Sequence, residues 1–205
     1  LENTHNRAGG RVFPQDTLEE TARQAHARGL RVHLDGARLW NAHVAGGLPL
    51  ARLAGPADSV SVCFSKGLGA PIGSVLAADR ATVARARKLR KLLGGGMRQV
   101  GVLAAACHYA LDHHLARLAD DHAHARALVD RLATRWLRPL HPVDTNIVIL
   151  GVTPPATPDA VLAHLQARGI LAVAFGPDRI RLVTNLGVGP ADVDRACAAL
   201  NEFAA

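Results

Sequence analysis

The sequence predicts an α/β fold, in which a mostly parallel, doubly wound sheet is followed by a small α/β domain. Short apolar strands alternate with helix-length segments through residues 16–93, and this alternation is typical of parallel strands joined by helices. The pattern changes to shorter strands and helices after a long helical region, near residue 120. We therefore expect one domain over residues 1–119 and a smaller one over residues 120–205.

Caps, glycines and apolar spacing predict the elements of the first domain. Residues 1–6 read as the end of a strand that runs into a polar loop. Asp16, with Glu19 three residues later, predicts a capped helix that runs through residue 27 and is ended by Gly29. Asp79 predicts a second cap, for a helix to residue 93. The other expected elements are strand 30–34, a loop with a short helical piece at 38–57, a strand from residue 59, and strand 74–78.

Three glycines at 94–96 separate that helix from the next one, which we expect to begin near Met97 with Arg98 in its first turn. A helix start that combines an arginine with free backbone amides is typical of an anion site. A glycine hinge between two helices is the alternative. The helix should continue to residue 118, followed by helix 120–137, strand 143–150, helix 158–168, strands 170–174 and 179–183, and helix 190–203.

The strand from residue 59 is an apolar, β-branched run that stops at Lys66, which is set among glycines. The chain has only two other lysines, Lys88 and Lys91, and uses arginine for most of its positive charge. Arginine cannot form a Schiff base, whereas a lysine that loses its proton can attack a carbonyl carbon. The pattern therefore favours a reactive amine at Lys66, with a surface lysine after a strand as the alternative.

The strand before it ends in a carboxylate, Asp35. If the two strands are parallel neighbours, Asp35 and Lys66 emerge at carboxyl ends, where open α/β sheets bind their ligands. A carboxylate facing a Schiff-base lysine suits pyridoxal 5'-phosphate, because the acid keeps the ring nitrogen protonated and the ring an electron sink. We expect pyridoxal phosphate as the cofactor.

Four ordered motifs carry a family resemblance. They are His-Leu-Asp-Gly-Ala-Arg at 33–38, Ser-Lys-Gly-Leu-Gly-Ala-Pro-Ile-Gly-Ser at 65–74, Gly-Gly-Gly-Met-Arg-Gln at 94–99, and Arg-Leu-Val-Thr-Asn at 181–185. With them the chain resembles the low-specificity L-threonine aldolases, pyridoxal-phosphate lyases of the aspartate-aminotransferase (type I) fold. The resemblance covers essentially the whole chain. It implies cleavage of L-threonine or L-allo-threonine, or of related β-hydroxy-α-amino acids, to glycine and an aldehyde.

The resemblance also implies roles for individual residues. Lys66 and Asp35 would be catalytic and would hold the cofactor, as above. Arg38 would contact the phenolic oxygen of the cofactor or the carboxylate of the substrate. Arg181 would grip the substrate carboxylate with both arms of its guanidinium, which fixes the amino acid across the ring; a strand arginine in a surface salt bridge is the alternative. Arg98 would reach the cofactor region, in its own or in a neighbouring subunit.

Some positions depart from the family pattern or match it less closely. Lys91 is a second candidate beside the arginine of the glycine-rich motif. Asn185 stands where the family more often has histidine, which leaves the substrate preference open. His5 is a distant candidate for the base that takes the β-hydroxyl proton.

Composition narrows the possible partners. The net charge is +7, but the arginines are spread over predicted helices and only 3% of residues are aromatic, so nucleic-acid binding is not expected. Three cysteines without a Cys-x-x-Cys pair indicate neither a disulfide framework nor a zinc site. The histidines around residues 108–124 lack metal-ligand spacing, so we expect no metal. No apolar run approaches the length of a bilayer span, which predicts a soluble, cytoplasmic protein.

The opening in mid-strand predicts that an upstream region of the enzyme precedes residue 1, and that these 205 residues alone are not a competent aldolase. A homodimer or homotetramer is expected for the whole enzyme. Two alternatives stay open: another type I pyridoxal-phosphate lyase or aminotransferase, and a non-catalytic fragment of such an enzyme. A dinucleotide-binding protein is excluded, because no Gly-x-Gly-x-x-Gly motif precedes Asp35 at the required distance.

Overall fold

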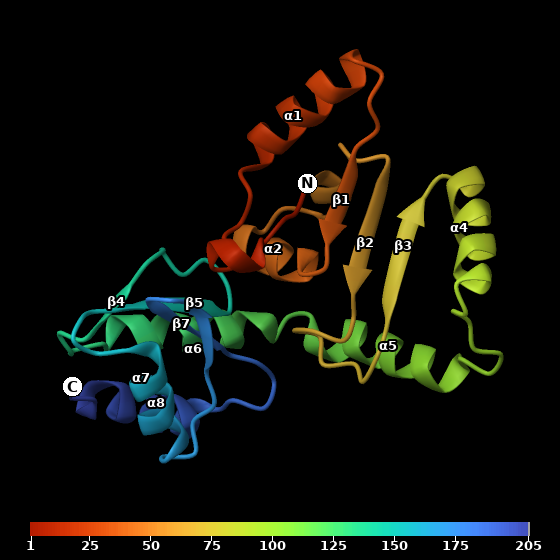
Figure 1. Cartoon of the computed structure of the whole chain (residues 1–205). Coiled ribbons are helices and arrows are strands. Elements are labelled where there is room, and N and C mark those ends of the chain that lie inside the picture. The colour runs from red at the N-terminus through yellow and green to blue at the C-terminus, as the bar shows by residue number, and fades with distance from the viewer. Residues whose placement is uncertain (205) are drawn as a thin grey trace. The chain divides into compact units, whose positions relative to one another are not determined.

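The computed structural model describes residues 1–204, which form two compact units (Figure 1). The first unit contains Leu1–Thr4 and Val12–Leu118, and the second contains His5–Arg11 and the chain from Ala119 onward. The units differ from the expected domains in the placement of residues 5–11. As functional domains, the ranges 1–119 and 120–205 stay a prediction.

The sheet of the first unit has the order β1-β2-β3, with β1 at His33–Gly36, β2 at Ser59–Cys63 and β3 at Ser74–Ala78. β1 and β2 are parallel, and β3 runs antiparallel to β2 at the edge, so the sheet is mixed there. Residues 1–3 bond to the other side of β1: the Asp35 N–H donates to the Leu1 carbonyl (2.8 Å), and the Asn3 N–H donates to the Asp35 carbonyl (3.1 Å). β1 therefore has bonded neighbours on both sides.

The helices of the first unit are α1 (Gln15–Ala27), α2 (Leu39–Gly46), α3 (Leu50–Ala54), α4 (Arg80–Leu92) and α5 (Gly101–His114). The first three pack on the parallel strands through one apolar cluster, which removes their apolar faces from water. Its buried members are Leu18, Leu34, Leu39, Ala42, Leu53 and Val60. A second cluster, which joins the loop after β2 to α5, comprises Phe64, Leu68, Ala70, Ala110 and Leu118.

Two expected helix starts are wrong. α1 begins at Gln15, so Asp16 lies inside the first turn and its carboxylate caps nothing; it faces solvent, 3.6 Å from Arg52 Nη2. Pro14 stands at the cap position instead, and its fixed φ ends the preceding loop there. α5 begins at Gly101, so Arg98 precedes the helix. The cap at Asp79 is confirmed: its Oδ1 accepts the Thr82 N–H at 2.9 Å.

The second unit is built on an antiparallel sheet of order β4-β5-β7-β6. Its strands are β4 (Leu137–Pro139), β5 (Ile147–Val152), β6 (Val173–Gly176) and β7 (Arg179–Val183). The helices α6 (Leu118–Asp130), α7 (Pro158–Gln166) and α8 (Pro190–Glu202) complete it, together with the short 3-10 helix η1 (Asn6–Ala8). The expected helix 120–137 is too long at its C-terminus, because the chain turns into β4, which was not expected.

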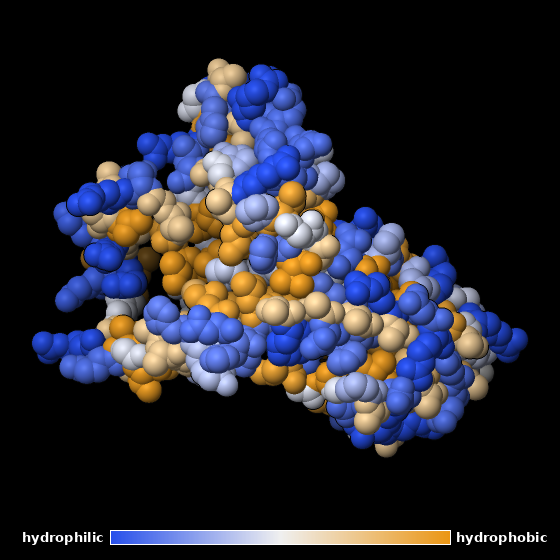
Figure 2. Space-filling view, turned by 180° about the vertical axis from the view of Figure 1, so that it is seen from behind, coloured by the Kyte–Doolittle hydropathy of each residue, from blue (hydrophilic) through white to orange (hydrophobic). Residues whose placement is uncertain are grey.

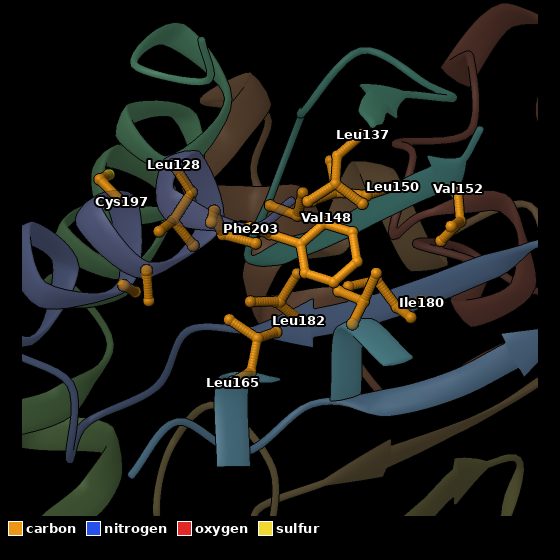
Figure 3. Packing of buried hydrophobic residues seen from close by; sticks show 14 of the residues in the cluster. Leu128, Leu137, Val148, Leu150, Val152, Leu165, Ile180, Leu182, Cys197 and Phe203 are labelled. Carbon is orange, nitrogen blue, oxygen red and sulfur yellow. The ribbon is translucent and has the colours of Figure 1, made fainter. Parts of the chain in front are cut away.

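The core of the second unit lies between this sheet and its helices. Figure 3 shows side chains of α6, α7 and α8 pointing toward those of β5 and β7. The members labelled there are Leu128, Leu137, Val148, Leu150, Val152, Leu165, Ile180, Leu182, Cys197 and Phe203. All six residues of β5 are buried, which makes this strand the centre of the unit. The core holds the neighbouring β7, and with it Arg181, in a fixed register.

Candidate active site

Lys66 lies on a tight loop that is fixed by a hydrogen bond within the loop and by packing on α5. The Gly69 N–H donates to the Lys66 carbonyl (2.8 Å), and the buried Leu68 fixes the loop on α5. Glycine at position 67 allows this close packing, because a Cβ there would lie 2.8 Å from Cδ2 of the buried Leu118, whose side chain would have to shift. The Lys66 side chain points into solvent and, within residues 1–204, forms no hydrogen bond or ion pair. The loop thus presents a primary amine that no protein group occupies.

Asp35 occupies the carboxyl end of β1, opposite Ser61 of the parallel strand β2. The two strands run in the same direction, so Asp35 and the loop of Lys66 belong to the same edge of the sheet. The Asp35 side chain is half-buried, and its Oδ1 accepts the Ala37 N–H at 3.0 Å. Among residues 1–204 this is the one hydrogen bond of the carboxylate, which leaves Oδ2 available to a ligand.

Arg38 follows three residues later as the N-cap of α2 and is half-buried. Its main chain is fixed, because its carbonyl accepts the Asn41 N–H (2.9 Å) and the Thr4 hydroxyl (3.0 Å). Thr4 is buried and has a φ of 55°. Arg38 is therefore held in the same unit and on the same segment as Asp35.

Arg98 is exposed and lines a hollow of about 520 Å³ in the first unit. Arg90, Lys91 and the backbone of residues 94–96 line the same hollow. Within the described part of the chain, residues 1–204, these three cations have no acidic partner. The hollow thus combines free positive charge with exposed backbone, although the predicted helix start is not there.

Arg181 belongs to the second unit, where it lies on β7 opposite Ile149 of β5 and Val173 of β6. Its Nη1 donates to Asn6 Oδ1 at 2.9 Å, and its guanidinium carbon lies 4.8 Å from the ring centre of Phe175. Its Nε is buried and has no partner in residues 1–204. Such an orphaned donor costs free energy unless a ligand accepts from it.

Asn6 and Phe175, the partners of Arg181, were not found from the sequence. Asn6 lies 175 positions from Arg181, so no local pattern connects them. The one sequence signal is the polar run Thr-His-Asn, followed after Arg7 and Ala8 by two glycines, which indicates a turn in this segment.

The remaining candidates, His5 and Asn185, both belong to the second unit. His5 is half-buried in the second unit at the start of η1. Asn185 is exposed and folds back on its own loop, with Oδ1 accepting the Gly187 N–H at 2.9 Å. In residues 1–204 no three histidine, cysteine or acidic side chains form a metal-binding group. No helix in that range has the length and apolar character needed to span a bilayer.

His122, a buried histidine of the second unit, has a strongly lowered pKa. His122 on α6 is 2% exposed. Burial, with a smaller contribution from the nearby Arg126 cation, lowers the pKa of His122 to about 4. The imidazole is therefore neutral at physiological pH and serves the packing of the second unit.

Known proteins resemble the whole chain. It is 41% identical over 198 residues to the probable low-specificity L-threonine aldolase 2 of Arabidopsis thaliana, and 39% identical over 205 residues to the low specificity L-threonine aldolase of Escherichia coli. These matches take in 95% and 100% of this chain but only 56% and 60% of the two relatives. The chain thus spans little more than half the length of its relatives.

The fold agrees with that of a solved structure, the threonine aldolase of Leishmania major, with a TM-score of 0.80 at 22% identity. That match covers 98% of this chain and 59% of the other. The predicted α/β fold of type I pyridoxal-phosphate enzymes is confirmed. Residues 1–154 match the beta-eliminating lyase family. The chain therefore belongs to the beta-eliminating lyase family.

Proposed function

We propose that this chain carries the lysine-bearing part of a low-specificity L-threonine aldolase, which cleaves L-threonine or L-allo-threonine to glycine and an aldehyde. The observation that carries the proposal is the pair formed by Asp35 and Lys66. Asp35 lies at the carboxyl end of β1 and Lys66 follows the parallel, hydrogen-bonded strand β2, and each offers an unpaired polar atom. The names of the relatives point to the same activity.

Pyridoxal 5'-phosphate fits the groups that are present. The Lys66 amine has no protein partner, so it can bind the cofactor covalently without breaking an ion pair. Asp35 keeps a free oxygen that can hold a proton on the ring nitrogen. Arg38 is a donor for the phenolic oxygen or the substrate carboxylate. Arg98 lies in a hollow whose uncompensated charge suits an anionic group.

When bound, the cofactor supplies an electron sink for the pair left on Cα as the Cα–Cβ bond breaks. The chain's own residues bind the substrate and the cofactor and orient them. Arg181 holds the substrate carboxylate through its charged N–H donors, which fixes the direction of the bond that breaks. Asp35 contributes a fixed negative charge that would keep the ring nitrogen of the cofactor protonated during the reaction. The β-hydroxyl must lose its proton, and His5 is the candidate of this chain for that role.

We further propose that the enzyme is a cytoplasmic homodimer or homotetramer. Leu92, Leu93 and Val102 are 80%, 83% and 72% exposed, which is unusual for large apolar side chains. In the same unit, an apolar hollow of about 540 Å³ is lined mainly by residues of β3, of α5 and of the segment between α4 and α5. Figure 2 shows apolar atoms gathered around the hollow between α4 and α5. The three cysteines are free thiols, which suits a reducing compartment.

The test is chemical trapping. The protein is incubated with pyridoxal phosphate, reduced with borohydride, digested and mapped by mass spectrometry. We expect the adduct on Lys66, and Lys66→Ala should abolish it while Lys88→Ala, a matched change on the exposed face of α4, should not. An adduct on Lys88 or Lys91 with Lys66 unmodified would overturn the assignment.

Product analysis separates the aldolase from related enzymes. The proposed reaction gives glycine and acetaldehyde from L-threonine without a second substrate. Amino-group transfer that requires a keto acid would instead identify an aminotransferase.

A further inference from the structure

We infer that Asn6 positions Arg181 for carboxylate binding, and that its neutral amide leaves the charge of Arg181 available to the substrate. The inference rests on the proposed function, because it presumes an amino-acid substrate. Asn6 Oδ1 accepts from Nη1 of Arg181 at 2.9 Å. It thereby occupies one arm of the guanidinium and leaves the edge formed by Nε and Nη2. That edge carries two parallel N–H groups, which match the two oxygens of a carboxylate.

The Nε donor of Arg181 is buried and has no hydrogen-bond partner in residues 1–204. The free edge of the guanidinium therefore includes a donor that a ligand oxygen could satisfy. The ring of Phe175 lies against the guanidinium at 4.8 Å and covers it without neutralising it. A bulge in β6 between Ala174 and Gly176 takes Phe175 out of the strand ladder, and bulges commonly redirect a side chain in this way. The two contacts together fix the plane of the guanidinium.

The segment that carries Asn6 is itself locked onto the second unit. The Gly10 carbonyl accepts the buried Thr145 hydroxyl at 2.7 Å, and Arg11 pairs with Asp144 at 2.6 Å. Gly10 has a φ of 67°, and a Cβ there would lie 2.5 Å from Thr145 Oγ1, so only glycine fits. This construction holds Asn6 on Arg181 at little entropic cost when the substrate binds.

The choice of an amide is the informative feature. Other arginines of the chain pair with carboxylates, namely Arg11, Arg23, Arg31, Arg52, Arg131, Arg168, Arg179 and Arg195. An aspartate in place of Asn6 would offer an oxygen at the same position, yet its charge would compensate the cation and compete with a ligand carboxylate. The amide orients Arg181 without that competition.

The test is the isosteric change Asn6→Asp in protein loaded with pyridoxal phosphate, with glycine as the carboxylate probe in calorimetric titration. We expect the dissociation constant for glycine to rise at least about tenfold, because a carboxylate beside Arg181 would compensate its charge and weaken its charge-assisted hydrogen bonds to the glycine carboxylate. The melting temperature should stay equal or rise, because the structural contact is kept. Gln166→Glu, an exposed change on α7, adds the same charge elsewhere and should alter neither quantity.

Arg181→Lys, measured in parallel, separates the role of Arg181 in the proposed function from the positioning role of Asn6. If Arg181→Lys weakens glycine binding but Asn6→Asp does not, Asn6 has only a structural role and the inference is wrong. If Arg181→Lys leaves glycine binding unchanged, the role of Arg181 in the proposed function is wrong, and the inference falls with it. Asn6→Ser, which keeps a neutral acceptor, should bind glycine more tightly than Asn6→Asp.

Discussion

Mild acid should destabilise the second unit through the buried imidazole of His122. Its pKa is lowered from 6.5 to about 4 in the folded state, first by burial and then by Arg126. The folded state therefore binds this proton less readily than the unfolded chain does, so stability falls as the pH drops from 6.5 toward 4. Each pKa unit corresponds to about 1.4 kcal/mol, which gives an upper limit of about 3 kcal/mol for the loss.

The chain offers a specific assay, because it has one tryptophan in each unit, Trp40 and Trp136. In a Trp40→Phe background, urea unfolding followed by Trp136 fluorescence reports on the second unit. Between about pH 7 and about pH 4.5 we expect the free energy of unfolding to fall by about 2 kcal/mol more than in a His122→Gln variant. His108→Gln, at an exposed histidine, should keep the full loss. Equal pH dependence with and without His122 would refute the reasoning.

Three further changes have defined outcomes. Gly67→Ala forces a Cβ to within 2.8 Å of Leu118 Cδ2, so the first unit should lose about 1–3 kcal/mol in urea unfolding, and an unchanged midpoint would contradict the packing argument. Asp79→Ala removes both bonds to Thr82 and should destabilise the start of α4 by about 1 kcal/mol, seen as faster hydrogen exchange there. In the complete enzyme, Asp35→Asn should still accept the cofactor but lower turnover by a factor of at least about 10²; near-normal turnover would make Asp35 a structural residue.

Local chemistry made part of the fold predictable. The Asp79 cap fixes the start of α4, and the strand expected at 179–183 is β7. The start of α1 was missed because Pro14 and Asp16 both suit the beginning of a helix, and only the packing of Gln15 decides between them: its amide donates to the Arg52 carbonyl at 2.8 Å. β4 was missed because three residues carry too little periodicity to be separated from a helix end.

The candidate site was predictable where it depends on single strands. Asp35 and Lys66 each end an apolar run, and such ends are visible in a sequence. The partners of Arg181 were not visible, because Asn6 and Phe175 reach it through a turn and a bulge. Nothing in a sequence window reports a contact over 175 positions.

The placement of residues 5–11 has a consequence for how the chain folds. Their bonds to Asp144, Thr145 and Arg181 close loops of 133, 135 and 175 positions. Closing such loops costs conformational entropy before the contacts that compensate for it have formed. These contacts therefore belong to the slow part of folding. During synthesis residues 5–11 leave the ribosome well before Asp144, Thr145 and Arg181, and they cannot form these bonds until that later part of the chain has followed. The contact between Asn6 and Arg181 forms only after both have been made, and a nascent chain released before residue 181 would have its lysine loop but not the proposed carboxylate anchor.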